Sequence, residues 1–342
     1  MTRKLKNNPT SFLVLCTGIG LGILFAGEAR IHAQERSDTV SLVFVGDVMM
    51  HKAQLDYDCT TFLEPIRPLL SKADIAVANL EFSLGGEPYT GYPAFSAPDA
   101  YAQYLSDCGI DVFLTANNHI LDRGLKGYER TLDIYRKMGK MPDFLDSKGI
   151  RIGFLNFSYG TNAPHIEKQS GIRLTDRDSL ASDIRRLHAF NVDFIVAFPH
   201  WGIEYKTHSN ASQQKLAEWL ARQGVDCILG SHPHVVQDTS HFCGQGGKKV
   251  PVVYSVGNCV SNMSARNTRL GLLVTLRFVK QGKEMKMLEP ELSWLWCTLP
   301  GRLKNTYMTI PVAEYINRRD EWLNPSDYDN MIQTLKRYEE NH

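Results

Sequence analysis

Five short apolar runs in this chain each end in side chains that can bind a metal ion. A run of this length that stops abruptly at polar residues is typical of a buried strand. Runs that alternate with helical segments favour a parallel sheet, whose strand ends lie along one edge and build the functional site. The polar residues at the ends of the runs are Asp47; Asn79 and Glu81; Asn117, Asn118 and His119; His200; and His232 and His234.

Each ending also has an ordinary structural explanation. Asp47 fits a turn, Glu81 fits a helix cap, and His200 fits a half-buried aromatic position. Asn117 and Asn118 fit a capping turn at the start of a helix. These explanations would have to hold independently for five endings, so one shared metal site is the better interpretation of the set.

Length and charge restrict the class of protein. The 342 residues suffice for one large domain or two modest ones, and the apolar fraction of 43% is ordinary for a globular chain. The formal net charge is +1, without the basic stripe that is typical of nucleic-acid binders. We therefore expect no nucleic-acid partner.

The N-terminal segment has the pattern of a targeting signal. Arg3, Lys4 and Lys6 precede an apolar stretch at residues 11–27, and the small residues around Ala33 favour cleavage after that position. An uncleaved membrane anchor is the alternative, since the stretch is nearly long enough to span a bilayer. We expect residues 1–33 to direct export to the periplasm or the cell exterior. Their removal would change the net charge from +1 by −3 to −2.

Six cysteines remain after the leader, so the chain has enough cysteines for up to three disulfides. Cys108 and Cys227 lie in or beside apolar runs and also fit the role of small buried hydrophobic residues. None lies in a close pair, which argues against a thiolate zinc site.

The remaining pattern predicts a single α/β body at residues 39–265, followed by C-terminal elements at 266–342 that complete it. Asp178 is the predicted N-cap of its helix, and Gly109, Gly139 and Gly224 are predicted helix stops. Helices are predicted at 60–72, 98–108, 124–138, 179–190, 210–223 and 325–340, strands at 150–156 and 251–256, and a hairpin at 270–279 and 285–295 around Gln281 and Gly282.

The ligand types indicate which metals the site would take. Borderline ions such as zinc, manganese or iron accept imidazole and amide oxygen as well as carboxylate. His119 follows a candidate ligand directly, so its ring is expected to point toward substrate and donate a proton, with Asp122 orienting it. The candidate metal ligands are Asp47, Glu81, Asn118, His200, His232 and His234.

Taken together, these motifs resemble the CapA-type poly-γ-glutamate capsule biosynthesis proteins, a branch of the calcineurin-like metallophosphoesterases. The resemblance covers roughly residues 40–265. It implies a four-layer α/β/β/α sandwich with a C-terminal β addition and helix, and a site for two divalent ions. The motifs that carry it are Gly46-Asp47, Asn79-Leu80-Glu81, Asn117-Asn118-His119 with Asp122 and Gly124, His200-Trp201-Gly202, and Gly230-Ser231-His232-Pro233-His234.

The resemblance also implies a role for each ligand. Asp47 and His234 would hold one ion, Glu81 would bridge, and Asn118, His200 and His232 would hold the second. His119 would be the proton donor.

The chain departs from the phosphoesterase pattern near the first ion. That pattern is Asp-x-His, whereas Met49 stands two positions after Asp47 and His51 two positions further on. The bridging residue is glutamate rather than aspartate. These two departures leave open a one-ion enzyme or a site that only binds. Pro233 supplies a further ordinary explanation of the last motif, since it favours an extended backbone in which the two neighbouring histidine rings would face different ways.

Three functions remain in competition at this point. The first is an exported metal-dependent hydrolase or transferase of a cell-surface polymer such as poly-γ-glutamate, with capsule-synthesis membrane proteins as partners. The second is a phosphoesterase that uses the same ions on a phosphorylated, anionic substrate. The third is a non-enzymatic assembly factor that binds polymer. Tyr89, Tyr92 and Phe95 fit either a mobile lip or an ordinary packed loop.

Overall fold

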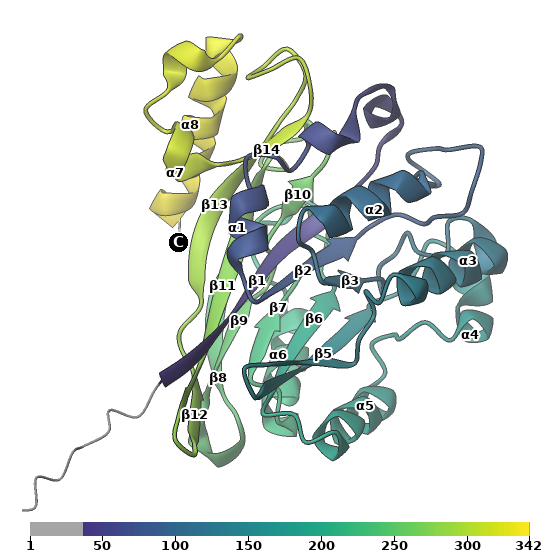
Figure 1. Ribbon diagram of the computed structural model, residues 1–342, viewed down its shortest axis with the longest axis vertical. Coiled ribbons are helices and arrows are strands. Elements are labelled where there is room, and N and C mark those ends of the chain that lie inside the picture. The colour runs from purple at the N-terminus through teal and green to yellow at the C-terminus, as the bar shows by residue number, and fades with distance from the viewer. Residues whose placement is uncertain (1–36, 342) are drawn as a thin grey trace, which may run out of the picture. The chain divides into compact units, whose positions relative to one another are not determined.

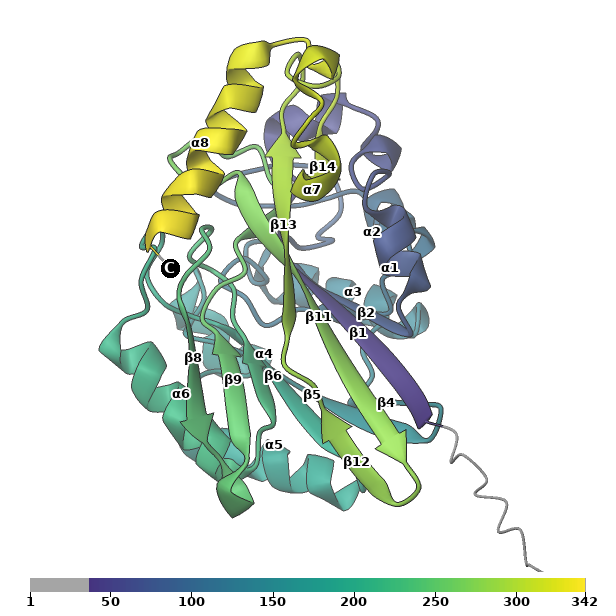
Figure 2. The same cartoon turned by 90° about the vertical axis from the view of Figure 1, so that its left-hand side faces the viewer.

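Two β-sheets lie face to face in residues 37–341, the part of the chain that the computed structural model describes (Figures 1 and 2). The predicted leader at residues 1–33 lies outside the described residues. The eight-stranded first sheet has the order β14-β13-β11-β1-β2-β3, with β10 paired to β1 and β12 to β11. Its strands are β1 (Ser37–Val48), β2 (Ile75–Leu80), β3 (Val112–Leu114), β10 (Asn258–Val260), β11 (Leu270–Gln281), β12 (Glu284–Met287), β13 (Glu291–Thr298) and β14 (Met308–Pro311).

The second sheet has six strands in the order β4-β5-β6-β7-β9-β8. The strands β5, β6, β7 and β9 run parallel, as β1, β2 and β3 do in the first sheet. Its strands are β4 (Phe144–Ser147), β5 (Ile150–Ser158), β6 (Phe194–His200), β7 (Cys227–Leu229), β8 (Thr239–Cys243) and β9 (Lys249–Val253).

Helices predicted from apolar spacing appear close to their expected bounds, apart from the first. Residues 60–72 form a short 3-10 turn and then α1, because proline cannot continue a helix through position 65. The N-cap of α5 is Asp176, whose carboxylate accepts from Ser179 N, so the predicted cap at Asp178 was wrong by two positions, and Asp178 lies in the first turn of the helix. The helices are α1 (Arg67–Lys72), α2 (Asp99–Asp107), α3 (Gly124–Lys137), α4 (Glu167–Ser170), α5 (Arg177–Ala189), α6 (Ala211–Gln223), α7 (Val312–Tyr315) and α8 (Pro325–Asn341).

Three hydrophobic cores separate the layers. Between the sheets, the rings of Phe44 in β1 and Phe198 in β6 have centroids 5.0 Å apart. Val45 points the other way and packs among side chains from α1 and α2, as strand alternation requires. Ile195 likewise packs outward against α5 and α6. Figure 2 shows α1 and α2 on one side of the sheets and α5 and α6 on the other. The predicted α/β/β/α sandwich is confirmed.

The C-terminal strands extend the first sheet. β11 pairs with β1 from Val45 back to Ser37, so it lies inside the sheet between β1 and β13. The turn at Gln281 and Gly282 is confirmed, but the predicted second arm divides into β12 and β13. A buried ion pair between Arg269 and Asp327, with Nη2 and Oδ2 2.7 Å apart, ties the start of β11 to α8.

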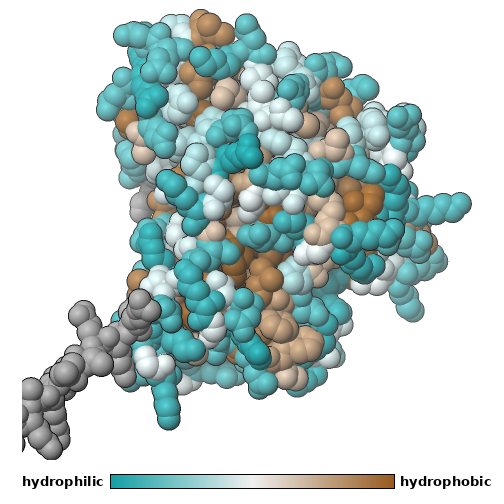
Figure 3. Space-filling model, viewed as in Figure 1, coloured by the Kyte–Doolittle hydropathy of each residue, from teal (hydrophilic) through white to brown (hydrophobic). Residues whose placement is uncertain are grey.

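The chemistry of the remaining surface is ordinary. The face shown in Figure 3 is largely hydrophilic, with smaller hydrophobic patches, as expected when most apolar side chains pack in the cores. None of the helices within residues 37–341 is both long and apolar enough to cross a membrane.

The cysteines of the described residues are free thiols: Cys59, Cys108, Cys227, Cys243, Cys259 and Cys297.

Candidate metal centre

The ends of β1, β2, β6 and β7 bring four predicted motifs into contact. Two overlapping groups of donor atoms form there, with all atoms of a group within 4.8 Å of one another. One group is Glu81, His200 and His232, and the other is Asp47, Glu81 and His234. Glu81 belongs to both groups, which is the arrangement expected of a carboxylate that bridges two ions.

Glu81 is fully buried, and neither carboxylate oxygen has a hydrogen-bond partner. Oε1 lies 3.7 Å from Nε2 of His200 and 3.7 Å from Nε2 of His234. Burial, and then the charge of Asp47, raise the pKa of Glu81 well above its usual range. A buried carboxylate without a partner is costly, and a divalent cation removes that cost. This position therefore fits a metal ligand.

His200 lies against Asn118, which follows β3 in the other sheet. Nε2 of His200 is 2.8 Å from Oδ1 of Asn118, and its Nδ1 is 3.0 Å from Oγ of Ser231. The contact with Asn118 is within hydrogen-bond distance, and an imidazole nitrogen and an amide oxygen this close together would both reach one ion of the borderline type. Burial, and then His232, lower the pKa of His200 well below its usual range, which favours the neutral ring that a metal requires.

The two neighbouring histidines turn toward the same site. His232 has φ 97° and His234 φ 56°, and their ring centroids are 6.0 Å apart. The expectation that Pro233 would separate the rings is therefore wrong, because the backbone takes up positive φ at both histidines. Such strained dihedrals cost about 1–3 kcal/mol each and gather at functional sites.

The two rings differ in their surroundings. Nδ1 of His232 is buried without a partner, and burial, then His234, lower the pKa of His232 to about 3. His234 Nδ1 donates to Oδ1 of Asn258 at 3.0 Å, which leaves Nε2 toward Glu81. Burial lowers the pKa of His234, but its interactions with Asp47, Asn258 and Glu204 together outweigh burial and raise it overall. The Asn258 contact is the kind of support that orients a histidine ligand.

The carboxylate of Asp47 accepts hydrogen bonds from groups that the sequence motifs did not predict as its partners. Nδ2 of Asn79 donates to Oδ1 of Asp47 at 2.7 Å, and the backbone N of His232 donates to Oδ2 at 3.2 Å. Asn117 in turn donates from Nδ2 to the carbonyl of Leu80 at 2.8 Å. The amides of Asn79 and Asn117 therefore orient the site, while Asn118 next to them faces His200.

His119 lies outside both donor groups. Its Nδ1 donates to Oδ2 of Asp122 at 2.7 Å, and the backbone N of Phe95 donates to the same oxygen at 2.8 Å. The ring of Phe95 packs edge-on against His119, with centroids 4.6 Å apart. The carboxylate of Asp122 thus leaves Nε2 of His119 as the atom available to a substrate.

Met49 and His51 take no part in these donor groups. Met49 is buried in the core beneath α1 and α2. His51 packs edge-on against Phe95, with centroids 5.2 Å apart, and burial lowers its pKa to about 4, with smaller effects of His234 and His119. Of the residues considered for a lip, Phe95 is fully buried whereas Tyr92 is 77% exposed.

A cavity of about 480 Å³ opens onto this centre. Asn118, His119 and His234 line it, together with Glu204, which sequence reasoning missed. Glu204 forms a third donor group with His232 and His234. It follows β6 by four positions in a loop, so it had no strand-end pattern that would single it out.

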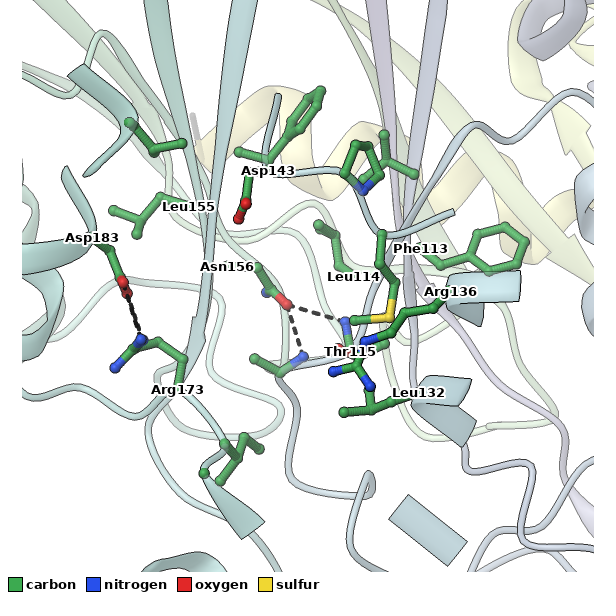
Figure 4. A pocket seen from close by; sticks show the side chains of 18 of the residues that line it. Phe113, Leu114, Thr115, Leu132, Arg136, Asp143, Leu155, Asn156, Arg173 and Asp183 are labelled. Atoms are coloured by element: carbon green, nitrogen blue, oxygen red, sulfur yellow. Dashed lines mark hydrogen bonds and ion pairs between the residues drawn. The ribbon is translucent and has the colours of Figure 1, made fainter. Parts of the chain in front are cut away.

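A second cavity, of about 260 Å³, lies between β3 and β5 (Figure 4). At its wall, Oδ1 of Asn156 accepts from Thr115 N at 3.1 Å and from Ala116 N at 2.8 Å. Nδ2 of Asn156 donates to the carbonyl of Phe198 at 2.9 Å. One amide on β5 therefore clamps the segment that leads to Asn118 against the strand that ends at His200.

Comparison with known proteins assigns this chain to a family. The model of the family described as bacterial capsule synthesis protein PGA_cap matches residues 41–263, which is more than half of the chain. The capsule biosynthesis protein CapA of Bacillus anthracis is 26% identical over 266 residues, which cover 70% of this chain. The chain spans only 64% of that relative, less than two thirds of its length. The PGA biosynthesis protein CapA of Bacillus subtilis (strain 168) is 26% identical over 274 residues, 72% of this chain and 69% of that protein.

Solved structures give more distant likenesses. A phosphatase from Mycoplasma pneumoniae has a TM-score of 0.46 and 14% identity, over 76% of this chain and 94% of that one. The calcineurin-like phosphoesterase YfkN from Bacillus subtilis has a TM-score of 0.45 and 15% identity, over 88% and 98%. Likenesses at these TM-scores say nothing about activity. The match of the family model does establish membership, and the chain belongs to the bacterial capsule synthesis proteins of the PGA_cap family.

Proposed function

We propose that this protein is an exported, metal-dependent hydrolase or transferase that acts on a capsule polymer. The observation that carries the proposal is the position of Glu81. It is a buried carboxylate with no hydrogen-bond partner, shared by two donor groups beside a cavity that also exposes His119. Asp47 and His234 would hold one ion with Glu81, and Asn118, His200 and His232 the other.

Divalent ions bound there, such as manganese, iron or zinc, would polarise a carbonyl or phosphoryl oxygen and stabilise developing negative charge. The chain's own contribution is proton transfer. His119 would donate from Nε2 to the leaving group as the scissile bond breaks, while Asp122 holds the ring in place through Nδ1. In hydrolysis, water then supplies the hydroxyl group to one product and restores the proton of His119.

An anionic substrate is supported by the proposed ions and not by the cavity's own side chains. No lysine or arginine is present among the described residues that line it, so the ions themselves would attract an anionic substrate. Poly-γ-glutamate, the polymer that the family name suggests, carries a carboxylate and an amide in each unit. We include it, or a similar cell-surface polymer, in the proposal, with capsule-synthesis membrane proteins as partners.

Export is a separate part of the proposal, supported by the charged and apolar pattern of residues 1–33. A fusion of the full chain to a reporter that is active only outside the cytoplasm should give signal, and deletion of residues 1–33 should abolish it. Equal signal with and without the segment would refute export by this leader.

The activity is tested by measuring metal content and turnover in one preparation. We expect bound transition metal and cleavage or transfer of a γ-glutamyl substrate in a panel that also holds phosphodiesters and phosphomonoesters. Turnover of phosphoesters alone would replace the proposal with a phosphoesterase. Bound metal without turnover on any of these, with polymer bound intact, would replace it with an assembly factor.

A further inference from the structure

Glu204 is the one acidic residue among the described residues that line the metal-centre cavity, and it is more exposed than the buried histidines beside it. A carboxylate oxygen of Glu204 and one nitrogen each of His232 and His234 lie within 4.8 Å of one another. Exposed acidic residues are commonplace, so this proximity requires further evidence. Nδ1 of His232, in a side chain only 3% exposed, is buried without a hydrogen-bond partner, so one histidine of this group has a nitrogen that a ligand would satisfy.

The position of Glu204 relates to both donor groups. His232 belongs to the group with His200, and His234 belongs to the group with Asp47, while Glu204 reaches one histidine of each. Glu81 joins the same two groups from the buried side. Glu204 is therefore the counterpart of Glu81 on the side that faces the cavity and solvent.

The backbone holds Glu204 in this place. Tyr205 has φ 65°, which is uncommon for a residue with a side chain, and its backbone N donates to the carbonyl of Pro233 at 2.8 Å. Gly202 has φ 98°, and a Cβ there would stand 2.8 Å from Nε2 of Gln213. The loop is thus tied to the segment between the two histidines, and the strain at Tyr205 fits a functional constraint.

We propose that Glu204 is a solvent-side metal ligand that an anionic group of the substrate displaces. This inference rests on the proposed function, because it requires ions in the two donor groups. With no lysine or arginine among the described lining residues, those ions are the groups that would compensate the charge of Glu204. A carboxylate or phosphate of the substrate offers the same oxygen chemistry, so it would compete for the same coordination positions.

The test is a titration of the metal-free full chain with Mn²⁺ alone, followed by inorganic phosphate, in the parent and in Glu204→Gln. Glutamine removes the charge at almost unchanged size. Loss of a coordinating carboxylate should weaken binding of Mn²⁺ by about 10-fold or more, on the scale that supporting groups of metal sites show. Phosphate should bind the Mn²⁺-loaded variant more tightly than the Mn²⁺-loaded parent, because its competitor is gone. Glu129→Gln, an exposed carboxylate outside the cavity, should match the parent in both titrations.

Equal Mn²⁺ affinity in Glu204→Gln and the parent would overturn the ligand role while leaving the proposed function intact. Weaker Mn²⁺ binding together with unchanged or weaker phosphate binding would overturn the displacement. A parent protein that binds no Mn²⁺, zinc or iron at all would overturn both this inference and the metal-dependent function.

Discussion

Nε2 of His200 lies 2.8 Å from Oδ1 of Asn118, although 82 positions separate the two residues: His200 ends β6 of one sheet, and Asn118 lies in the turn after β3 of the other. The candidate metal centre is therefore assembled by the packing of the sheets against each other. Donors from β1 and β2 meet donors from β6 and β7 at the same place. Metal binding and the docking of the two sheets should accordingly depend on each other, since an ion that binds only the folded state stabilises it.

Removal of two imidazoles should empty the site. We expect His200→Ala combined with His232→Ala to lose most of the bound transition metal, because both nitrogens belong to the group with Glu81. Metal content by mass spectrometry of the purified protein measures this. The matched control is His165→Ala with His188→Ala, two exposed histidines, which should keep the metal of the parent. Equal metal in the two double variants would contradict the assignment.

His119→Asn should separate catalysis from metal binding. The side chain of His119 is hydrogen-bonded to Asp122 and lies outside the donor groups, so the metal content of the variant should equal that of the parent. Turnover should fall by about 10²–10⁴-fold, the usual cost of losing a general acid. Both quantities need to be measured on the same preparation. A site emptied by this substitution would make His119 a ligand, whereas full turnover would make it a structural residue.

Glu81→Gln should change stability in opposite directions with and without metal. In the metal-free parent, the raised pKa of Glu81 means that the folded state retains a proton that the unfolded state releases above its ordinary pKa of about 4.5. The contribution of Glu81 to the folding stability is therefore lost as the pH rises from the pKa of the unfolded state toward the raised pKa of the folded state. At pH 8 the metal-free variant should therefore be more stable than the metal-free parent, by about 1 kcal/mol or more.

Addition of Mn²⁺ should reverse that order, because the carboxylate becomes a ligand. Urea unfolding at pH 5 and pH 8, with chelator or with Mn²⁺, gives the four comparisons. The comparison at pH 8 is the informative one, because the lowered pKa values of His200 and His232 affect stability only below about pH 6.5. A variant less stable than the parent under all conditions would show that Glu81 is an ordinary structural carboxyl.

Asn156 should act on the metal centre from a distance. Asn156→Leu removes the acceptor for Thr115 N and Ala116 N and the donor to Phe198, so the segment before Asn118 loses its clamp. We expect metal affinity to fall by about 10-fold, as for other supporting groups of metal sites. Asn156→Asp keeps the acceptor and loses only the donor, so it should retain more affinity than Asn156→Leu. An equal loss in both variants would assign the effect to general destabilisation.

Local patterns in the sequence predicted the strands and the donors at their ends, whereas the arrangement of the strands in two packed sheets was implied only by the family resemblance. Apolar runs that end in Asp47, Glu81 or His200 can be read without knowing the partner strand. The support for those donors could not be read in this way. Asn258 lies 24 positions after His234, and only the folded chain brings its side chain to Nδ1 of that histidine.

Other differences have equally local physical causes. The extended backbone expected beside Pro233 gave way to positive φ at both histidines, where contacts of the whole site outweigh a dipeptide preference. Glu204 was not predicted as a site residue because it lies in a loop, where polar residues are common and do not by themselves indicate a functional site. The split of residues 60–72 could have been anticipated, since Pro65 and Pro68 both lie within that stretch.

The central claim is that two donor groups share Glu81 between two metal ions. Anomalous diffraction from crystals of the purified protein, collected on both sides of the absorption edge of the bound metal, tests it most directly. We expect two peaks, one among Asp47, Glu81 and His234 and one among Glu81, Asn118, His200 and His232, with an oxygen of Glu81 near each. Crystals grown with added metal that show no peak at these residues, or peaks only elsewhere on the protein, would contradict it.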